Sequence, residues 1–360
     1  MKYQYWLANI RGIGNHNIHK LLQTADCAEE LYFLKEEQLE KIPGISLSKV
    51  HALVESRKTW DLDAEILKLS EKGIDFWSEE MPHFPVALKN IADAPYAIYV
   101  KGRFPPPGSF NVALVGARTC SQYGRNVALE LGKKLASAGV GVVSGMALGI
   151  DAYSHWGALE GEGDTFAVLG SGVDVCYPAS NRALYDKILE QGGIISEYPP
   201  GTQPVAKLFP ARNRIISAVS DVVVVIEARE RSGSLITADY ALEQGKDIYA
   251  VPGGIYDSLS RGCNGLIRQG AGIVSSVDAF LEELDFVPRQ NFHPEKIKKL
   301  SLEKDEWLVY SVISLLGKNI ETLLKETELE LSEMIGILAS LQQKGLIEES
   351  FKNFYRRRNQ

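Results

Sequence analysis

The sequence predicts an α/β protein with a doubly wound, mostly parallel β-sheet at its centre. A helical segment is expected before the sheet and a smaller helix-and-hairpin segment after it. Six short apolar runs alternate with helical patterns between residues 110 and 285, and that alternation is typical of parallel sheets covered on both faces. The chain has 360 residues, of which 45% are apolar and 24% are charged. Its size and composition therefore indicate a folded protein of more than one domain.

Residues 1–75 have the pattern of short helices separated by two glycine-containing turns, RGIG at 11–14 and PGIS at 43–46. This arrangement resembles helix-hairpin-helix and SAM-like domains, in which a glycine turn lets backbone N–H groups approach a phosphate. The segment holds 10 Lys and Arg against 12 Asp and Glu, so a structural role and a DNA-binding role both stay open. His16 and His19 share a helical face but have no third ligand for a metal.

The predicted sheet belongs to residues 76–287, of which 76–105 form an extended, proline-containing lead-in. Each apolar run ends at a glycine, arginine or proline, and a helical pattern follows it. These features are typical of a Rossmann-like domain, in which ligands bind beyond the carboxyl ends of the strands. The strands are expected within 111–118, 140–145, 165–172, 192–199, 221–228 and 247–253, and the helices within 122–139, 152–162, 181–191, 211–220 and 233–246.

Residues 288–300 are a polar linker, and 301–360 have the order of a winged helix: three helices and then a hairpin. The last segment holds 8 Lys and Arg against 10 Asp and Glu. Because readers of the major groove usually carry more positive charge, this balance disfavours a transcription factor. We expect the segment to be dispensable for DNA binding.

The loops at the predicted strand ends are rich in glycine, serine and arginine. In the first loop, Gly116 permits close backbone approach, Arg118 adds a guanidinium fork, and the next helix is expected to offer free N–H groups. The loop is neither GxGxxG nor a Walker loop, which disfavours a nicotinamide or ATP site. Residues 76–287 hold 17 Lys and Arg against 23 Asp and Glu, yet arginines gather at the strand ends, as a polyanion site requires. The residues expected to bind phosphate are Gly116, Arg118, Ser144, Gly145, Gly170, Gly172, Arg182, Arg212, Asn213, Ser232, Gly233 and Ser234.

Catalytic groups are scarce in the same loops. Glu197 is the one strand-end carboxylate that could act as a general base, and it could equally pair with an arginine. Asp151 is expected to cap a helix and His155 to be a packed side chain. Cys120 and Cys176 have no histidine near them in sequence to activate a thiolate. The sequence therefore predicts no catalytic residue, no metal and no cofactor.

Composition limits the protein's surroundings. The four cysteines form no CxxC pair, and the chain shows neither a secretory signal nor an apolar run long enough to span a membrane, so a reducing cytoplasm is expected. The net charge of −7 excludes a uniformly basic coat for nucleic acid but is compatible with a local basic groove.

The loops together resemble the DNA-processing protein A family, also called DprA or Smf. The resemblance covers about residues 80–280 and rests on motifs whose order and spacing are more specific than those of a general Rossmann domain. The matching segments are GARTCSQYG, SGMALGIDAYSHWGAL, VLGSGVDVCYP, ISEYPPGTQP, FPARNRIIS, RSGSLITADYALEQGKDIYAVPG and GCNGLIRQGA.

The resemblance implies a protein that binds single-stranded DNA in natural transformation and helps to load the RecA recombinase, without a cofactor or turnover. It implies that Arg118 is the main phosphate anchor. One departure is Ala179, because many members have a basic residue directly after the tyrosine-proline turn. Arg182, one helical turn later, is expected to take over that phosphate.

The resemblance also implies a homodimer contact in residues 262–274. Leu266, Ile267 and Ile273 are the apolar residues expected there, because a two-fold contact must be self-complementary. A helix packed on the sheet would explain the same residues.

An enzymatic alternative stays open. Related Rossmann proteins hydrolyse the N-glycosidic bond of nucleoside monophosphates with a glycine-rich phosphate loop and a glutamate. Glu197 and the RSGS loop are compatible with that chemistry, although this chain has RSGSLIT where such enzymes have a PGGxGT-type loop.

Overall fold

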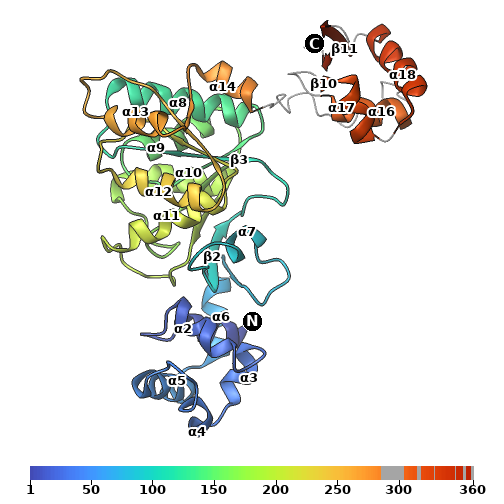
Figure 1. Cartoon of the computed structure of the whole chain (residues 1–360). Coiled ribbons are helices and arrows are strands. Elements are labelled where there is room, and N and C mark those ends of the chain that lie inside the picture. The colour runs from blue at the N-terminus through green and yellow to red at the C-terminus, as the bar shows by residue number, and fades with distance from the viewer. Residues whose placement is uncertain (285–303, 314–317, 328, 345, 352–353, 358–360) are drawn as a thin grey trace. The chain divides into compact units, whose positions relative to one another are not determined.

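The computed structural model describes residues 1–284, 304–313, 318–327, 329–344, 346–351 and 354–357 (Figure 1). Two compact units make up the chain, Met1–Ser275 and Ser276–Gln360. Within the described residues, the first unit contains a nine-stranded sheet and the second a three-stranded sheet.

The large sheet has the strand order β1-β2-β6-β5-β4-β3-β7-β8-β9. The strands from β6 to β9 in that order are parallel to one another. At one edge of the sheet, β2 is antiparallel to β6 and β1 is antiparallel to β2. Because β3 pairs with both β4 and β7, the order reverses between β3 and β7, which is where doubly wound sheets bind ligands. The strands are β1 (Ile74–Ser78), β2 (Ala97–Gly102), β3 (Asn111–Val115), β4 (Gly141–Ser144), β5 (Thr165–Val168), β6 (Gly193–Ser196), β7 (Val222–Val225), β8 (Asp247–Ala250) and β9 (Gly272–Ile273).

Helices cover both faces of this sheet (Figure 1). Continuous valine and isoleucine runs make the central strands apolar on both sides, and every residue of β3 and β7 is buried, so each face requires a helical layer. One layer is α8 (Gln122–Ser137), α9 (Ile150–Glu160) and α10 (Arg182–Gln191), the last preceded by η1 (Ala179–Asn181). The other is α7 (Val86–Lys89), α11 (Leu208–Ala218), α12 (Gly233–Glu243) and α13 (Arg261–Arg268).

The predicted α/β architecture is confirmed, and β3 to β8 each fall within an expected strand range. Two strands of the large sheet were not expected. β9 lies within residues 262–274, where a helix packed on the sheet or a dimer contact was expected. Residues 74–78 form β1, whose burial alternates along the strand, so a boundary between residues 75 and 76 falls inside a strand. Five residues between a glycine and a proline-rich stretch gave too short a pattern to be distinguished from an extended lead-in.

The N-terminal helices share a hydrophobic core with one side of the sheet. Trp6, Leu21 and Leu53 belong to the same buried cluster as Phe76 and Tyr99 of the β1–β2 pair. Residues 1–275 are therefore one compact unit, and the finer division of the chain into domains stays a prediction. The helices are α1 (Lys2–Asn9), α2 (Asn15–Leu22), α3 (Ala28–Phe33), α4 (Glu36–Leu39), α5 (Leu47–Thr59) and α6 (Leu62–Glu71).

The second unit has its own small core around Val309, Leu323 and Leu338. Its strand order, β10-β12-β11, and its succession of helices and hairpin agree with the expected pattern, while the winged-helix assignment stays a prediction. The expected linker at 288–300 lies outside the described residues. The elements are α14 (Val277–Glu283), α16 (Lys304–Val312), β10 (Lys318–Asn319), α17 (Ile320–Thr327), α18 (Leu331–Gln343), β11 (Ile347–Phe351) and β12 (Phe354–Arg357). Within the described part of the chain, no helix is long and apolar enough to cross a membrane.

Candidate functional site

A pocket of about 280 Å³ lies at the carboxyl ends of the central strands, where the strand order reverses. Its walls come from the loop after β3, the start of α9, the first turns of α11 and the start of α12. The pocket brings together more than half of the residues that the sequence predicted to bind phosphate: Gly116, Arg118, Arg212, Asn213, Ser232, Gly233 and Ser234.

Arg118 stands exposed at this pocket. Its guanidinium carbon lies 5.3 Å from the centre of the Phe209 ring, a distance at which a cation is attracted to an aromatic face. Phe209 in turn lies 5.5 Å, centroid to centroid, from Tyr177. No described carboxylate forms an ion pair with Arg118, so its charge is held in place by an aromatic ring and stays available to an anion.

The first turn of α12 forms the opposite wall. Ser232 caps the helix, its hydroxyl accepting a 3.4 Å hydrogen bond from the N–H of Ser234. No described residue outside this turn lies within 4 Å of the position that a Gly233 side chain would occupy, so a ligand can approach the backbone there. Asn213 donates from Nδ2 to the Gly233 carbonyl at 3.2 Å, which ties α11 to this turn.

The start of α8 is closed to an anion, contrary to the expectation that it offers free N–H groups. The buried carboxylate of Glu227, just after β7, accepts a hydrogen bond from the Ser121 N–H at 2.9 Å and another from the Ser121 hydroxyl. That hydroxyl also accepts from the N–H of Gly124 at 3.1 Å. The protein's own carboxylate thus occupies the place that a phosphate takes in nucleotide-binding Rossmann proteins. Sequence analysis missed Glu227, and its position directly after a buried strand was the available signal.

Arg212 is buried, and its hydrogen bonds hold the backbone around the pocket in place. Its guanidinium donates to the Gly145 carbonyl at 3.0 Å and to the Val168 carbonyl, at the ends of β4 and β5. Burial lowers the pKa of Arg212 to about 10, and the nearby Asp151 opposes that shift. Burial raises the pKa of Asp151, and Arg212 opposes that shift. Asp151 accepts from the N–H of Ala147, in the loop before α9, at 3.4 Å. The expectation that Asp151 caps the helix is wrong, because the N-cap of α9 is Gly149 and Asp151 lies inside the first turn.

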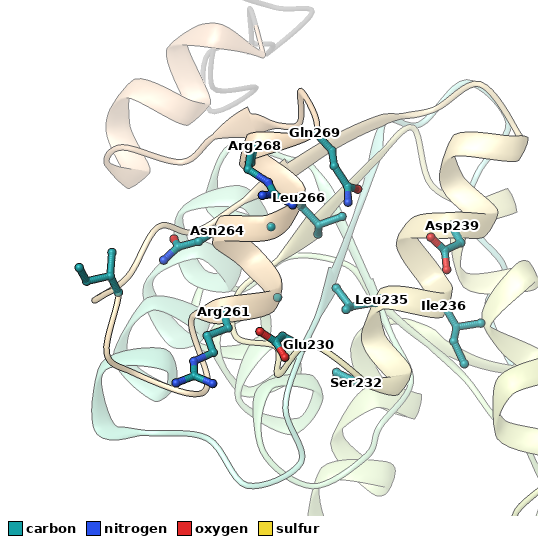
Figure 2. A pocket seen from close by; sticks show the side chains of 13 residues that line it. Glu230, Ser232, Leu235, Ile236, Asp239, Arg261, Asn264, Leu266, Arg268 and Gln269 are labelled. Atoms are coloured by element: carbon teal, nitrogen blue, oxygen red, sulfur yellow. The ribbon is translucent and has the colours of Figure 1, made fainter.

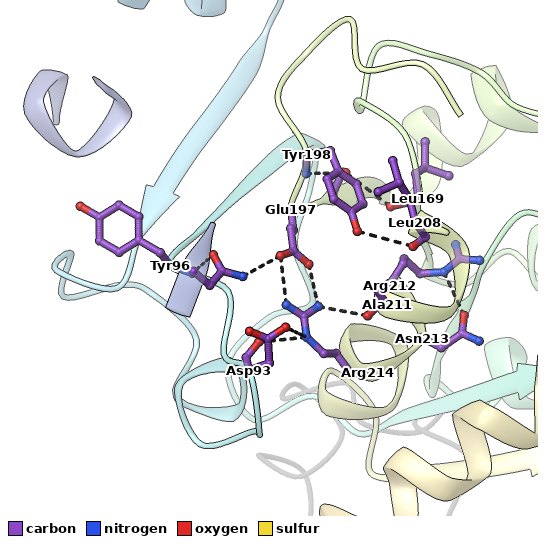
Figure 3. A network of polar contacts seen from close by, with 12 residues as sticks. Asp93, Tyr96, Leu169, Glu197, Tyr198, Leu208, Ala211, Arg212, Asn213 and Arg214 are labelled. Carbon is purple, nitrogen blue, oxygen red and sulfur yellow. Dashed lines mark hydrogen bonds and ion pairs between the residues drawn. The ribbon is translucent and has the colours of Figure 1, made fainter. Parts of the chain in front are cut away.

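Glu197 is held in an ion pair, the alternative that the sequence left open for it. Its two carboxylate oxygens accept hydrogen bonds from Arg214 at 2.6 and 3.0 Å (Figure 3). A third donor is Asn15 Nδ2 of α2, at 2.8 Å. Arg214 also donates to the carbonyls of Asp93 and Ala211, at 2.9 and 3.1 Å. With its oxygens occupied by charged and neutral donors, the Glu197 carboxylate is not placed to take a proton from a substrate.

The remaining predicted phosphate-binding residues lie outside the pocket lining. Ser144 is fully buried and donates to the Leu114 carbonyl at 2.6 Å. Arg182 is exposed on α10 and pairs with Asp186 at 3.0 Å. Gly145 and Gly170 make room for neighbours: a side chain there would meet Arg212 or Phe209 within 3 Å, and Gly172 packs in the same way on the 199–201 turn.

A wider hollow of about 850 Å³ adjoins the pocket between α12 and α13. Figure 2 shows Leu235, Ile236 and Asp239 of α12 across it from Arg261 and Leu266 of α13. Ser232 lines both hollows, so the two adjoin at this residue.

The two cysteines singled out from the sequence are not activated. Burial raises the pKa values of the Cys120 and Cys176 thiols, which disfavours a reactive thiolate. Among the described residues, no cluster of His, Cys, Asp and Glu could hold a metal ion.

Comparison with known proteins decides the family. The model of the family described as DNA recombination-mediator protein A matches residues 75–285, well over half of the chain. The chain belongs to this family. It is 38% identical over 284 residues to the DNA processing protein DprA of Streptococcus pneumoniae, covering 79% of this chain and 98% of that protein. It is 39% identical over 215 residues to DprA of Bacillus subtilis, covering 59% of this chain and 72% of that protein.

Solved structures of the family agree with this assignment. The X-ray structure of S. pneumoniae DprA has a TM-score of 0.69 and 37% identity, over 79% of this chain and 98% of that one. A structure of DprA from Helicobacter pylori, described as showing a single-stranded-DNA binding mode, has a TM-score of 0.54 and 29% identity, over 58% of this chain and 95% of that one. The family resemblance inferred from the loop motifs is therefore confirmed.

His155 of α9 is a packed histidine, as expected, and it contacts Thr165 of β5. Thr165 donates its hydroxyl proton to the Val142 carbonyl, so it accepts from His155 Nδ1 at 2.7 Å, and Nε2 is buried without a partner among the described residues. Burial lowers the pKa of His155 from 6.5 to about 3.

We predict that His155 makes the protein sensitive to acid. The unfolded chain takes up a proton below pH 6.5 while the folded imidazole stays neutral until about pH 3, so stability falls as pH decreases through this window. In His155→Asn, the loss of unfolding free energy between pH 7 and pH 5 should be smaller by about 2 kcal/mol. Urea denaturation at both pH values measures it, with the exposed His51→Asn as control. An unchanged pH dependence in His155→Asn would contradict this account.

Proposed function

We propose that the protein binds single-stranded DNA at the 280 Å³ pocket and delivers it to the RecA recombinase, as a recombination mediator. Membership in the family supports this proposal, as does the H. pylori relative whose structure is described by its single-stranded-DNA binding mode. The observation that carries it is the Arg118 guanidinium, which lies over Phe209 with no ion pair to a described residue, beside the open first turn of α12.

In this arrangement a backbone phosphate binds between Arg118 and the amide of Gly233, and the adjoining base lies near the Phe209 and Tyr177 rings. Phosphate contacts hold a strand without reading its sequence, and aromatic faces accept any base. A duplex keeps its bases stacked and paired, so it can offer phosphates but no base to these rings. The site therefore favours single strands over duplexes and discriminates weakly among sequences.

Arg118→Glu should weaken single-strand binding by about 10- to 100-fold, about 1.4 to 2.7 kcal/mol. The salt dependence should also become shallower, because each phosphate contact on a single strand contributes a slope of about 0.7. Fluorescence anisotropy with a labelled oligothymidylate across a salt series measures both. Lys133→Glu makes the same charge change at an exposed position on α8 and should bind as wild type. Equal affinity of Arg118→Glu and wild type would remove the pocket from the DNA site.

We propose that the protein acts without catalytic turnover. The enzymatic alternative requires a glutamate that can accept a proton, and the carboxylate of Glu197 already accepts from Arg214 and Asn15. Purified protein incubated with nucleoside monophosphates should release no free base by chromatography, and Glu197→Gln should release none either. Repeated turnovers that disappear in Glu197→Gln would instead establish a hydrolase.

We further propose a homodimer formed through the edge of the sheet at β9, acting in the cytoplasm with RecA. Leu266 and Ile267 are half-buried and pack on the protein's own core, so part of their apolar surface is used by the fold. Ile273, by contrast, is 48% exposed on an edge strand. Edge strands with exposed apolar residues are prone to pair with another chain, and two linked pockets would hold one strand at a raised effective concentration.

Ile273→Arg should therefore give a folded monomer that binds short oligonucleotides normally and long ones at least about tenfold more weakly, as lost avidity requires. Light scattering reports the mass, and anisotropy reports both affinities. Exposed Leu242→Arg on α12 serves as the control for adding a charge. A persistent dimer in Ile273→Arg would exclude β9 from the interface.

A further inference from the structure

The loop after β8 presents two large apolar side chains to solvent. Tyr256 is 92% exposed and Ile255 is 74% exposed, although both belong to a well-packed unit. They follow Pro252, Gly253 and Gly254 at the carboxyl edge of the sheet, the edge that holds the DNA pocket. Adjoining apolar residues this exposed are typical of a binding surface.

The loop that carries these side chains is fixed at several points. The Tyr123 hydroxyl of α8 donates to the Pro252 carbonyl at 3.1 Å. Asn264 of α13 bonds the backbone of Gly253 twice, accepting at 3.3 Å and donating at 3.0 Å. At the far end of the loop, the Ala228 N–H after β7 donates to the Leu259 carbonyl at 2.7 Å. Tyr256 is thus displayed by an ordered backbone, which limits the entropy lost when a ligand binds.

Arginines surround the same loop. Arg229 and Arg231 follow β7, Arg261 begins α13, and all three are exposed without an ion pair to a described residue. The Gly262 N–H donates to the Ala228 carbonyl at 2.8 Å, so the two arginine-bearing segments lie side by side. Two carboxylates, Glu230 and Asp257, are also present, which leaves a modest positive excess over this patch.

The patch adjoins the DNA pocket. Ser232 lines the pocket and also the wider hollow, whose lining includes Glu230, Ile255 and Arg261. Figure 2 shows Ser232, Glu230 and Arg261 together at one end of that hollow. A strand that leaves the pocket past Ser232 therefore meets Arg261 and then the loop after β8.

We propose that Ile255 and Tyr256 form a second base-stacking platform, which binds nucleotides beyond those held in the pocket, with Arg229, Arg231 and Arg261 contacting the intervening phosphates. The inference rests on the proposed function, because it extends the same strand. Stacking suits this position, since each aromatic face accepts any base and the patch carries too little excess charge to hold a strand by phosphates alone. A duplex would offer no exposed base to Tyr256.

The experiment compares oligothymidylates of about 6 and about 20 nucleotides, because only the longer one extends beyond a single aromatic and basic site. Tyr256→Ala should bind the short oligonucleotide as wild type and the long one about 5- to 10-fold more weakly. Tyr256→Phe keeps the ring and should restore wild-type affinity. Trp156→Ala, at a partly exposed aromatic residue on α9, is the matched control and should leave both affinities unchanged. Folding of Tyr256→Ala is not at risk, since the side chain is almost fully exposed.

Two results would overturn the platform. One is unchanged affinity of Tyr256→Ala for the long oligonucleotide. The other is a loss that coincides with dissociation of the dimer in light scattering, which would assign Tyr256 to a contact with a second copy of the chain. Failure of the proposed function looks different, since wild-type protein would then not bind the short oligonucleotide or Arg118→Glu would bind it equally well.

Discussion

The arrangement of the site depends on the burial of two arginines on α11. A buried guanidinium is costly unless its donors are satisfied. Arg212 meets this requirement at the carbonyls that end β4 and β5, and Arg214 at Glu197 after β6. Because α11 is the connection that crosses from β6 to β7, these bonds fix it across the carboxyl edge of the sheet. Phe209 and Asn213, on the same helix, are thereby held against Arg118 and the first turn of α12.

The N-termini of α8 and α12 both lie at the reversal of strand order, but only one of them is open to a ligand. Glu227 occupies the start of α8, while the start of α12 opens into the pocket. In nucleotide-binding Rossmann proteins the first of these positions holds the pyrophosphate. Filling it with a carboxylate repels an anion from the start of α8, while the start of α12 stays open beside the half-buried Phe209 ring.

The sequence predicted the parallel sheet and its edge well, because valine-rich strands that end at glycine or arginine have few other solutions. It grouped Arg118, Asn213 and the Ser232–Ser234 turn correctly at one edge, since parallel strands end on the same side. It could not predict contacts made across the chain. Asn15 and Glu197 are 182 residues apart, and Arg212 resembles a phosphate ligand until its carbonyl partners are known. Short patterns failed as well, as at β1.

The net charge of −7 raises the question of how an acidic protein attracts a polyanion. Screening answers part of it, because at physiological salt charges more than about 8 Å apart hardly interact. The local balance of charge at the carboxyl edge then decides whether a polyanion is attracted. At that edge Arg118, Arg229, Arg231 and Arg261 are exposed without carboxylate partners among the described residues. Few phosphate contacts give a shallow salt dependence, so under the proposed function much of the affinity comes from stacking on rings such as Phe209. An acidic surface elsewhere opposes non-specific coating by nucleic acid. Under the proposed function, a strand held at few points by aromatic rings can pass to a recombinase without first disrupting a large electrostatic interface.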